Sequence, residues 1–144
     1  MQGNQDLEKL IYELQYLRGA AQNIQQRIGL INATIAETQV AISTLEGINN
    51  EESGSSMLMP IGGGSYVRAK LDDSEKLIVG IGADVAVEKT VAETKEEFQS
   101  RILEFEKARA SLKQQLDNIS ANMNGIQREA QKLAQQTRGE AKNV

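Results

Sequence analysis

The sequence is constrained most by a repeat in which apolar residues follow one another at alternating spacings of three and four. In the N-terminal part the repeat keeps one register through twelve positions, of which eleven are apolar. These positions are Leu7, Leu10, Leu14, Leu17, Ala21, Ile24, Ile28, Ile31, Ile35, Thr38, Ile42 and Leu45. This a/d pattern of a coiled coil predicts one long helix over residues 5–47. At 1.5 Å per residue the stripe is about 57 Å long, so it needs a partner along its whole length.

The same repeat returns near the C-terminus, where ten of twelve positions are apolar. These positions are Phe98, Ile102, Phe105, Arg109, Leu112, Leu116, Ile119, Met123, Ile126, Ala130, Leu133 and Thr137. Thr90 and Glu93 have the spacing of a capping box, which marks the start of a helix. We therefore predict a second helix over residues 90–138.

The simplest partner for each helix is the other one, folded back antiparallel. Pairing positions whose numbers add to 143 or 144 aligns the two stripes end to end. In that register Ala21 faces Met123, so a small residue meets a large one, as dense packing prefers. Arg109 faces Ile35, and its charged head can extend to solvent. A slip of one heptad would place Ala21 against Ala130 and leave a gap.

The middle of the chain carries strand-like runs separated by turn signals, which predict two β-hairpins over residues 57–71 and 77–88. The run Leu77–Ile81 is apolar on both faces, and a two-helix coiled coil is too narrow to cover both. Short hairpins alone are marginally stable, and their unpaired edges invite pairing with another chain. We therefore expect the chain to form oligomers through its hairpins.

Composition excludes most kinds of catalytic and metal site. The chain has no Cys and no His, so it lacks a thiol nucleophile, the commonest general base and the usual ligands of structural zinc. The triplet Gly62-Gly63-Gly64 is no phosphate loop, because it leads into a strand without a Lys-Ser/Thr pair. We expect a protein that is not an enzyme and that uses no cofactor and no metal.

Charge and hydropathy exclude two further classes of partner. The net charge is -4 and no segment is strongly basic, which gives no support to nucleic-acid binding. No apolar run is long enough to cross a membrane, and the polar N-terminus lacks the core of a signal peptide. We expect a cytoplasmic protein that binds neither nucleic acid nor membrane.

The two ends of the chain meet at one end of the predicted coiled coil, here called the tip. Ile11, Tyr12 and Tyr16 lie off the a/d stripe, and the two tyrosines share a helix face because they are four residues apart. Ordinary helix packing explains these tyrosines equally well. Fraying at the tip would expose stripe residues, which makes it a candidate site for binding unfolded chains.

The order helix, two hairpins, helix resembles the alpha-type subunit of prefoldin. The segment Met59–Leu71, MPIGGGSYVRAKL, is similar to the family's first hairpin, and Leu77–Lys89, LIVGIGADVAVEK, is similar to its second. Two hairpins point to the alpha type, since beta-type subunits have one. The resemblance covers nearly the whole chain, which we take as one prefoldin-like domain over residues 1–144.

The resemblance implies an α+β fold and an ATP-independent chaperone. In this family two alpha and four beta subunits join their hairpins into a β-barrel hub from which the coiled coils project. The distal tips hold non-native client proteins and pass them to a group II chaperonin. The hub residues implied for this chain are Val67, Ala69, Leu71, Leu77, Ile78, Val79, Ile81, Val85 and Val87. The candidate client-holding residues are suggested by their position at the tip alone. They are Leu7, Leu10, Ile11, Leu14, Ile126 and Leu133.

Two other classes of function remain open from the residues alone. A structural or adaptor coiled coil would dock one folded partner and would ignore denatured proteins. A hairpin arm that grips nucleic acid, as some synthetases carry, is disfavoured by the balanced charge.

Overall fold

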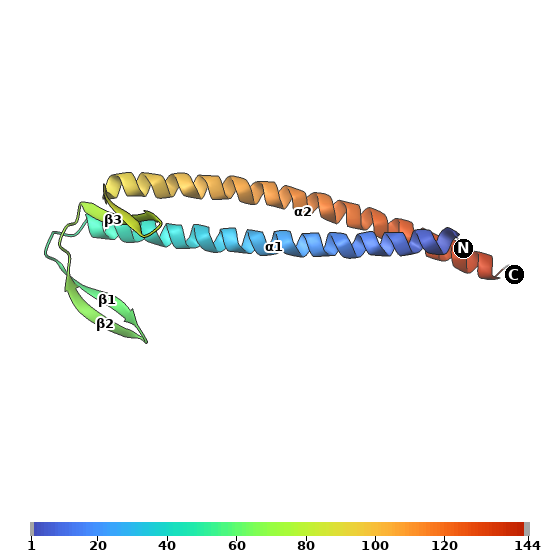
Figure 1. Ribbon diagram of the computed structural model, residues 1–144, viewed down its shortest axis with the longest axis horizontal. Helices are drawn as coiled ribbons and strands as arrows, with labels where there is room; N and C mark the ends of the chain where they lie inside the picture. Colours follow the sequence, from blue (N-terminus) through green and yellow to red (C-terminus); the bar gives the residue numbers. More distant parts are fainter. Residues whose placement is uncertain (1, 143–144) are drawn as a thin grey trace. The chain divides into compact units, whose positions relative to one another are not determined.

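The computed structural model describes residues 2–142. Four consecutive strands lie in the sequence between two long helices (Figure 1). In chain order they are α1 (Gln2–Asn49), β1 (Ser56–Gly62), β2 (Ser65–Lys70), β3 (Lys76–Gly82), β4 (Val85–Thr90) and α2 (Val91–Lys142). The predicted fold class is confirmed: two long helices are separated by two antiparallel β-hairpins. The helix α1 is longer at both ends than expected, and α2 continues beyond residue 138. The oligomeric hub is not a property of the single chain and stays a prediction.

The chain divides into two compact units, each of which contains a stretch of both helices. Unit 1 consists of residues 1–33 and 106–144, and unit 2 consists of residues 34–105. Unit 1 is helical throughout its described part, whereas unit 2 contains both hairpins together with the end of α1 and the start of α2.

The helical stretches of unit 1 run antiparallel beside each other. A Cβ placed on Gly3 would lie 3.7 Å from Oγ1 of Thr137, so the first turn of α1 touches the last part of α2 (Figure 1). At the other end of the unit, Nη1 of Arg109 donates a hydrogen bond of 2.8 Å to Oδ1 of Asn32. The numbers of these pairs add to 140 and 141, which excludes the slipped register that would pair Ala21 with Ala130. The predicted sum of 143 or 144 for facing stripe residues stays a prediction.

The a/d stripe is the side of each helix that is withdrawn from solvent. Every one of the 24 stripe positions predicted from the repeat is buried or half-buried. Ile24 and Leu112 in unit 1, and Ile35 and Leu45 in unit 2, are the most deeply buried stripe residues. At roughly 25 cal/mol per Å² of apolar surface, this burial is what holds helices of such length in place.

The predicted capping box at the start of α2 is confirmed. The N–H of Glu93 donates to Oγ1 of Thr90 at 3.1 Å, and the N–H of Thr90 donates to Oε2 of Glu93 at 3.5 Å. Together these bonds satisfy two backbone donors that a helix start leaves open. The next turn is tied back by Thr94, which is buried and donates its hydroxyl to the carbonyl of Thr90 at 2.9 Å.

The two hairpins have the same construction, 20 residues apart. Ser56 pairs with Lys70 and Gly62 with Ser65 in the first, and Lys76 pairs with Thr90 and Gly82 with Val85 in the second. Each β-ladder has one register shift just before its two-residue turn. The glycine triplet therefore contains the last residue of β1 and the two-residue hairpin turn, in agreement with the turn that the sequence indicated.

The two turns meet the same backbone requirement with different residues. Two-residue turns of type I′ need positive φ at both central positions. In the first hairpin Gly63 and Gly64 adopt φ of 59° and 73°. In the second hairpin Ala83 and Asp84 adopt φ of 51° and 60°, which is unfavourable for a residue with a Cβ such as alanine.

Candidate functional site

The hairpins leave large apolar side chains in contact with solvent. Ile78 is 82% exposed and Leu58 is 65% exposed, although strand residues of this type are normally covered. The large apolar residues exposed on the hairpins are Leu58, Met59, Ile61, Tyr66, Val67, Ile78, Ile81 and Val85. A concentration of this kind on two short hairpins is typical of a surface that another chain covers.

The hub residues implied by the resemblance fall into two groups in the structure. The exposed group consists of Val67, Ile78, Ile81 and Val85. The half-buried group consists of Ala69, Leu71, Leu77, Val79 and Val87. Val79 pairs directly with Val87, so these two side chains shelter each other on one face of the second hairpin. On the opposite face Ile78 has Glu88 as its cross-strand partner, which leaves its side chain open.

The exposed apolar residues of the first hairpin were largely missed by sequence reasoning. Met59 pairs with Val67 on one face, while Leu58 and Tyr66 lie on the other. The strand β1 is apolar on both faces. The signal for this is its continuous apolar run MLMPI, which resembles the run Leu77–Ile81 of the second hairpin.

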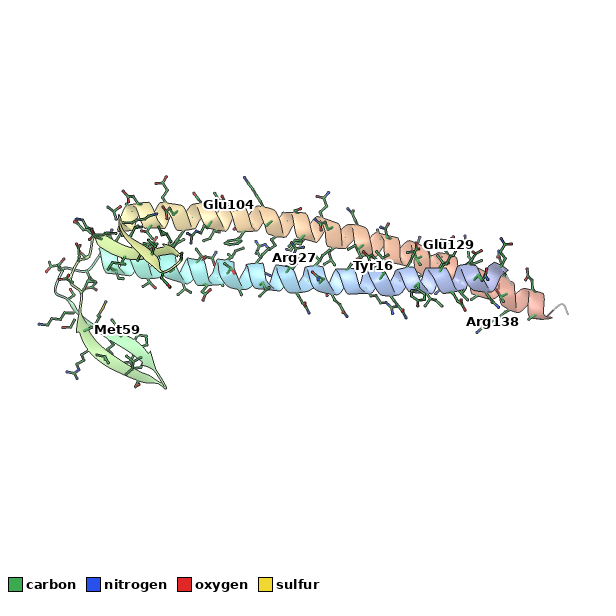
Figure 2. All side chains as sticks on the ribbon, viewed as in Figure 1. Tyr16, Arg27, Met59, Glu104, Glu129 and Arg138 are labelled. Carbon is green, nitrogen blue, oxygen red and sulfur yellow. The ribbon has the colours of Figure 1, made fainter. Side chains whose placement is uncertain are left out.

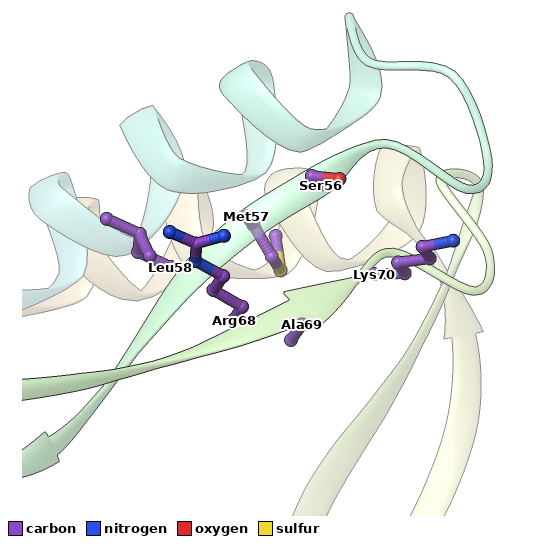
Figure 3. A pocket seen from close by; sticks show the side chains of 6 residues that line it. All are labelled: Ser56, Met57, Leu58, Arg68, Ala69 and Lys70. Atoms are coloured by element: carbon purple, nitrogen blue, oxygen red, sulfur yellow. The ribbon is translucent and has the colours of Figure 1, made fainter.

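A shallow groove crosses the first hairpin near its base. Its walls are formed by Ser56, Met57, Leu58, Arg68, Ala69 and Lys70 (Figure 3). Leu58 is the cross-strand partner of Arg68, and Met57 is the partner of Ala69. The first hairpin therefore combines an apolar surface with two cationic side chains.

The predicted client-holding residues do not form one exposed apolar surface. Five of them lie on the a/d stripe and are half-buried: Leu7, Leu10, Leu14, Ile126 and Leu133. Ile11 is exposed, and the neighbouring Tyr12 and Tyr16 are 76% and 78% exposed. The exposed face of this part of α1 is therefore aromatic, and the stripe behind it is occupied by packing against α2.

Unit 1 has a groove of its own between the two helices. Figure 2 labels two of the residues that line it, Tyr16 on α1 and Glu129 on α2. The complete lining consists of Glu13, Tyr16, Leu17, Ala121, Asn122, Gly125, Ile126 and Glu129. It brings Ile126, one of the predicted client-holding residues, beside Tyr16, which sequence reasoning noted without assigning a role.

Small residues of α2 are part of the groove lining in unit 1. A Cβ placed on Gly125 would meet no atom within 4 Å, so the space above this residue is open. Ala121 lies one turn earlier on the same face.

Neither a metal site nor a membrane segment is found in the part of the chain that the structure describes. Within residues 2–142 no three carboxylates lie close enough together to hold a metal ion. In the same range neither helix has a stretch apolar enough to span a membrane.

Comparison with known proteins places this architecture in a family. The prefoldin subunit family matches residues 17–136. The chain is 33% identical over 135 residues to the prefoldin subunit alpha of Pyrococcus horikoshii, covering 93% of this chain and 91% of that one. It is 42% identical over 112 residues to the prefoldin subunit alpha of Methanopyrus kandleri, covering 78% of this chain and 71% of that one.

A solved structure has the same fold. A cryo-EM structure of filamentous PFD from Methanocaldococcus jannaschii superposes with a TM-score of 0.73 at 21% identity. The match covers 82% of this chain and 98% of the other. Prefoldins are a family of chaperones and not of enzymes, and their alpha subunits assemble with other subunits. On the family match and the similarity to alpha subunits over most of its length, this chain belongs to the prefoldin family as a chaperone-type subunit.

Proposed function

We propose that this chain is the alpha subunit of an ATP-independent chaperone that holds non-native proteins at the tips of its coiled coils. Its hairpins join those of four beta subunits and a second alpha subunit in a β-barrel hub. The assembly acts in the cytoplasm and passes its clients to a group II chaperonin.

The single observation that carries this proposal is the contrast between a covered helical stripe and uncovered hairpins. Ile78, Leu58 and Ile61 are each more than half exposed, while the predicted stripe positions are all buried or half-buried. Covering such side chains stabilises an assembly by about 25 cal/mol per Å² of apolar surface removed from water. Isolated two-stranded hairpins also have unpaired edges, which a neighbouring hairpin can complete.

Client holding follows from several arms acting together. A weak apolar contact on one arm gains strength when other arms bind the same client, because the later contacts become intramolecular. Such binding needs no hydrolysis step. Release follows when the chaperonin competes for the client or for the tips.

The experiment that tests client holding removes the tips and keeps the hairpins. The variant complex contains this chain without residues 1–14 and 126–144. The helix ends of its partner subunits are shortened to the same extent, so that every tip is removed. We expect the native mass to fall only by the mass deleted, and suppression of aggregation of a denatured test protein to be lost. Unchanged suppression by the trimmed complex would contradict the proposal.

A second measurement tests the assembly itself. The chain is purified with its endogenous partners and its native mass is determined. A complex of two copies with four copies of a smaller two-helix protein is expected, and a long filament would point to an assembly like that of the structural neighbour. A single folded partner with no affinity for denatured proteins would return the adaptor hypothesis to first place.

A further inference from the structure

We propose that the groove of unit 1 binds client segments in which an apolar side chain stands next to Lys or Arg. This inference rests on the proposed function and deepens it, since it assigns a binding surface and a preferred class of client segment. The groove lies on the flank of the helix pair, on residues 13–17 of α1 and 121–129 of α2. The groove includes Ile126, one of the predicted client-holding residues, and its other lining residues lie outside that predicted set.

The floor of the groove suits an apolar side chain. Leu17 and Ile126 are stripe residues that are only half-buried, so part of each side chain remains accessible beside the groove. Gly125 adds no side chain to the groove, and a Cβ placed there would meet no neighbouring atom within 4 Å. Burying one apolar client side chain there would remove surface on both partners from water.

The rim of the groove suits a cation. Its only charged residues are the carboxylates of Glu13 and Glu129, which come from different helices, and no basic side chain lines it. Lys9 and Lys132 stand one helical turn from these carboxylates but form no ion pair with them. Within residues 2–142 the ion pairs are Lys89 with Glu97 and Lys95 with Glu46, all in unit 2. Glu13 and Glu129 are both exposed, so a partner can reach their carboxylates.

The exposed tyrosine at the groove adds an aromatic face. Tyr16 lines the groove and is 78% exposed, and Tyr12 continues the same face one turn earlier. A Lys or Arg side chain over a tyrosine ring is attracted by its π-electrons, and an apolar side chain packs against the same ring. Aromatic, apolar and acidic groups together favour a segment that is both apolar and basic over one that is apolar and acidic.

The test measures binding of two labelled, unstructured peptides to the intact assembled complex by fluorescence anisotropy. One peptide alternates Leu and Phe with Arg, and the other has Glu in place of every Arg. We expect the basic peptide to bind about five- to tenfold more tightly, since exposed charge pairs contribute modestly and salt screens them. The Glu13→Gln, Glu129→Gln double variant should bring the two affinities close together. Equal affinities for the wild-type complex would overturn the preference for cations.

The groove itself is tested by filling it. Gly125→Leu places a side chain in the open space and is expected to weaken binding of the basic peptide at least tenfold. Gly29→Leu is the matched control, because Gly29 also lies in a helix of unit 1 with open space around its Cβ position, and it does not line the groove. Equal binding by both variants would overturn the location. Circular dichroism confirms that each variant is folded.

The outcomes separate this inference from the proposed function. If the wild-type complex suppresses aggregation but Gly125→Leu and the glutamine variant behave like wild type, the groove assignment is wrong and the chaperone function stands. If the wild-type complex neither suppresses aggregation nor binds either peptide, the proposed function itself is wrong.

Discussion

Along the helices every predicted stripe position is at least half-buried, whereas on the hairpins Ile78 is 82% exposed and Leu58 is 65% exposed. Both regions carry a high density of apolar residues, so composition alone does not separate them. The two regions differ in whether the chain itself supplies a packing partner. Each helix has the other helix of its own chain beside it, while each hairpin is an isolated two-stranded sheet. The helices are thus covered within one chain, whereas the hairpins are left uncovered, as the proposed assembly through them requires.

The largest effect is expected on the uncovered hairpins. Ile78→Glu places a charge on the exposed face of the second hairpin, where it would be buried on assembly without a partner. We expect the assembled complex to be lost, with the helix content of the chain retained. Sedimentation velocity and circular dichroism measure the two properties. Leu103→Glu is the control, since Leu103 is also more than half exposed but lies on a helix, and assembly should survive. Equal loss in both variants would break the comparison.

The next effect concerns the helical stripe. Leu112 is 6% exposed, and Leu112→Ala should lower the free energy of unfolding by about 2–4 kcal/mol, because it removes a buried side chain and leaves a cavity. Leu103→Ala should change it by less than about 0.5 kcal/mol. Urea denaturation of the two variants measures both values. A cost at Leu103 as large as that at Leu112 would show that the stripe does not carry the stability.

A smaller effect is expected at the junction between hairpin and helix. Thr90→Ala removes the side-chain acceptor for the N–H of Glu93 and should cost about 1 kcal/mol of stability. Thr44 is a suitable comparison, because its hydroxyl donates to the carbonyl of Val40 inside α1, away from a helix start, and alanine is at least as favourable there. Thermal unfolding of both variants tests this. No loss of stability in Thr90→Ala would mean that the capping box is dispensable.

The smallest effect distinguishes the two hairpins. Ala83→Asn should stabilise the second hairpin by about 0.5 kcal/mol, because asparagine tolerates the left-handed backbone that Ala83 adopts at φ 51°. At the equivalent place in the first hairpin, Gly63→Ala should destabilise by about 1 kcal/mol. Hydrogen exchange of the strand amides reports both changes. The two substitutions are expected to change the stability of their hairpins in opposite directions. Changes in the same direction would contradict the matched construction of the turns.

The helices and hairpins were predictable from sequence because each has a local period that the physics of its element requires. The stripe from Leu7 to Leu45 keeps its 3-4 spacing without a break, and Thr90 with Glu93 marks a helix start that the hydrogen bonds confirm. The glycine triplet indicated the first turn for the same local reason.

The surfaces were harder to predict because they depend on what lies opposite. The groove of unit 1 is lined by Tyr16 of α1 and Gly125 of α2, which both lie off the a/d stripe, whereas the repeat predicts pairing only along the stripe. The exposure of Leu58 and Tyr66 likewise depends on which hairpin face is left uncovered, which alternation alone does not show. Period predicts which residues share a face, and the packed structure decides which faces are left open.

The central claim is that the exposed apolar hairpin residues become an interface, while the exposed residues of unit 1 stay accessible. Hydroxyl-radical footprinting of the free chain and of the purified assembly tests both parts in one experiment. Met59 and Tyr66 report on the two faces of the first hairpin, and Tyr12 and Tyr16 report on unit 1; Figure 2 labels Met59 and Tyr16. Strong protection of the hairpin residues on assembly, with unchanged oxidation of Tyr12 and Tyr16, is the predicted result. Unchanged oxidation of Met59 and Tyr66 in the assembly would contradict the account.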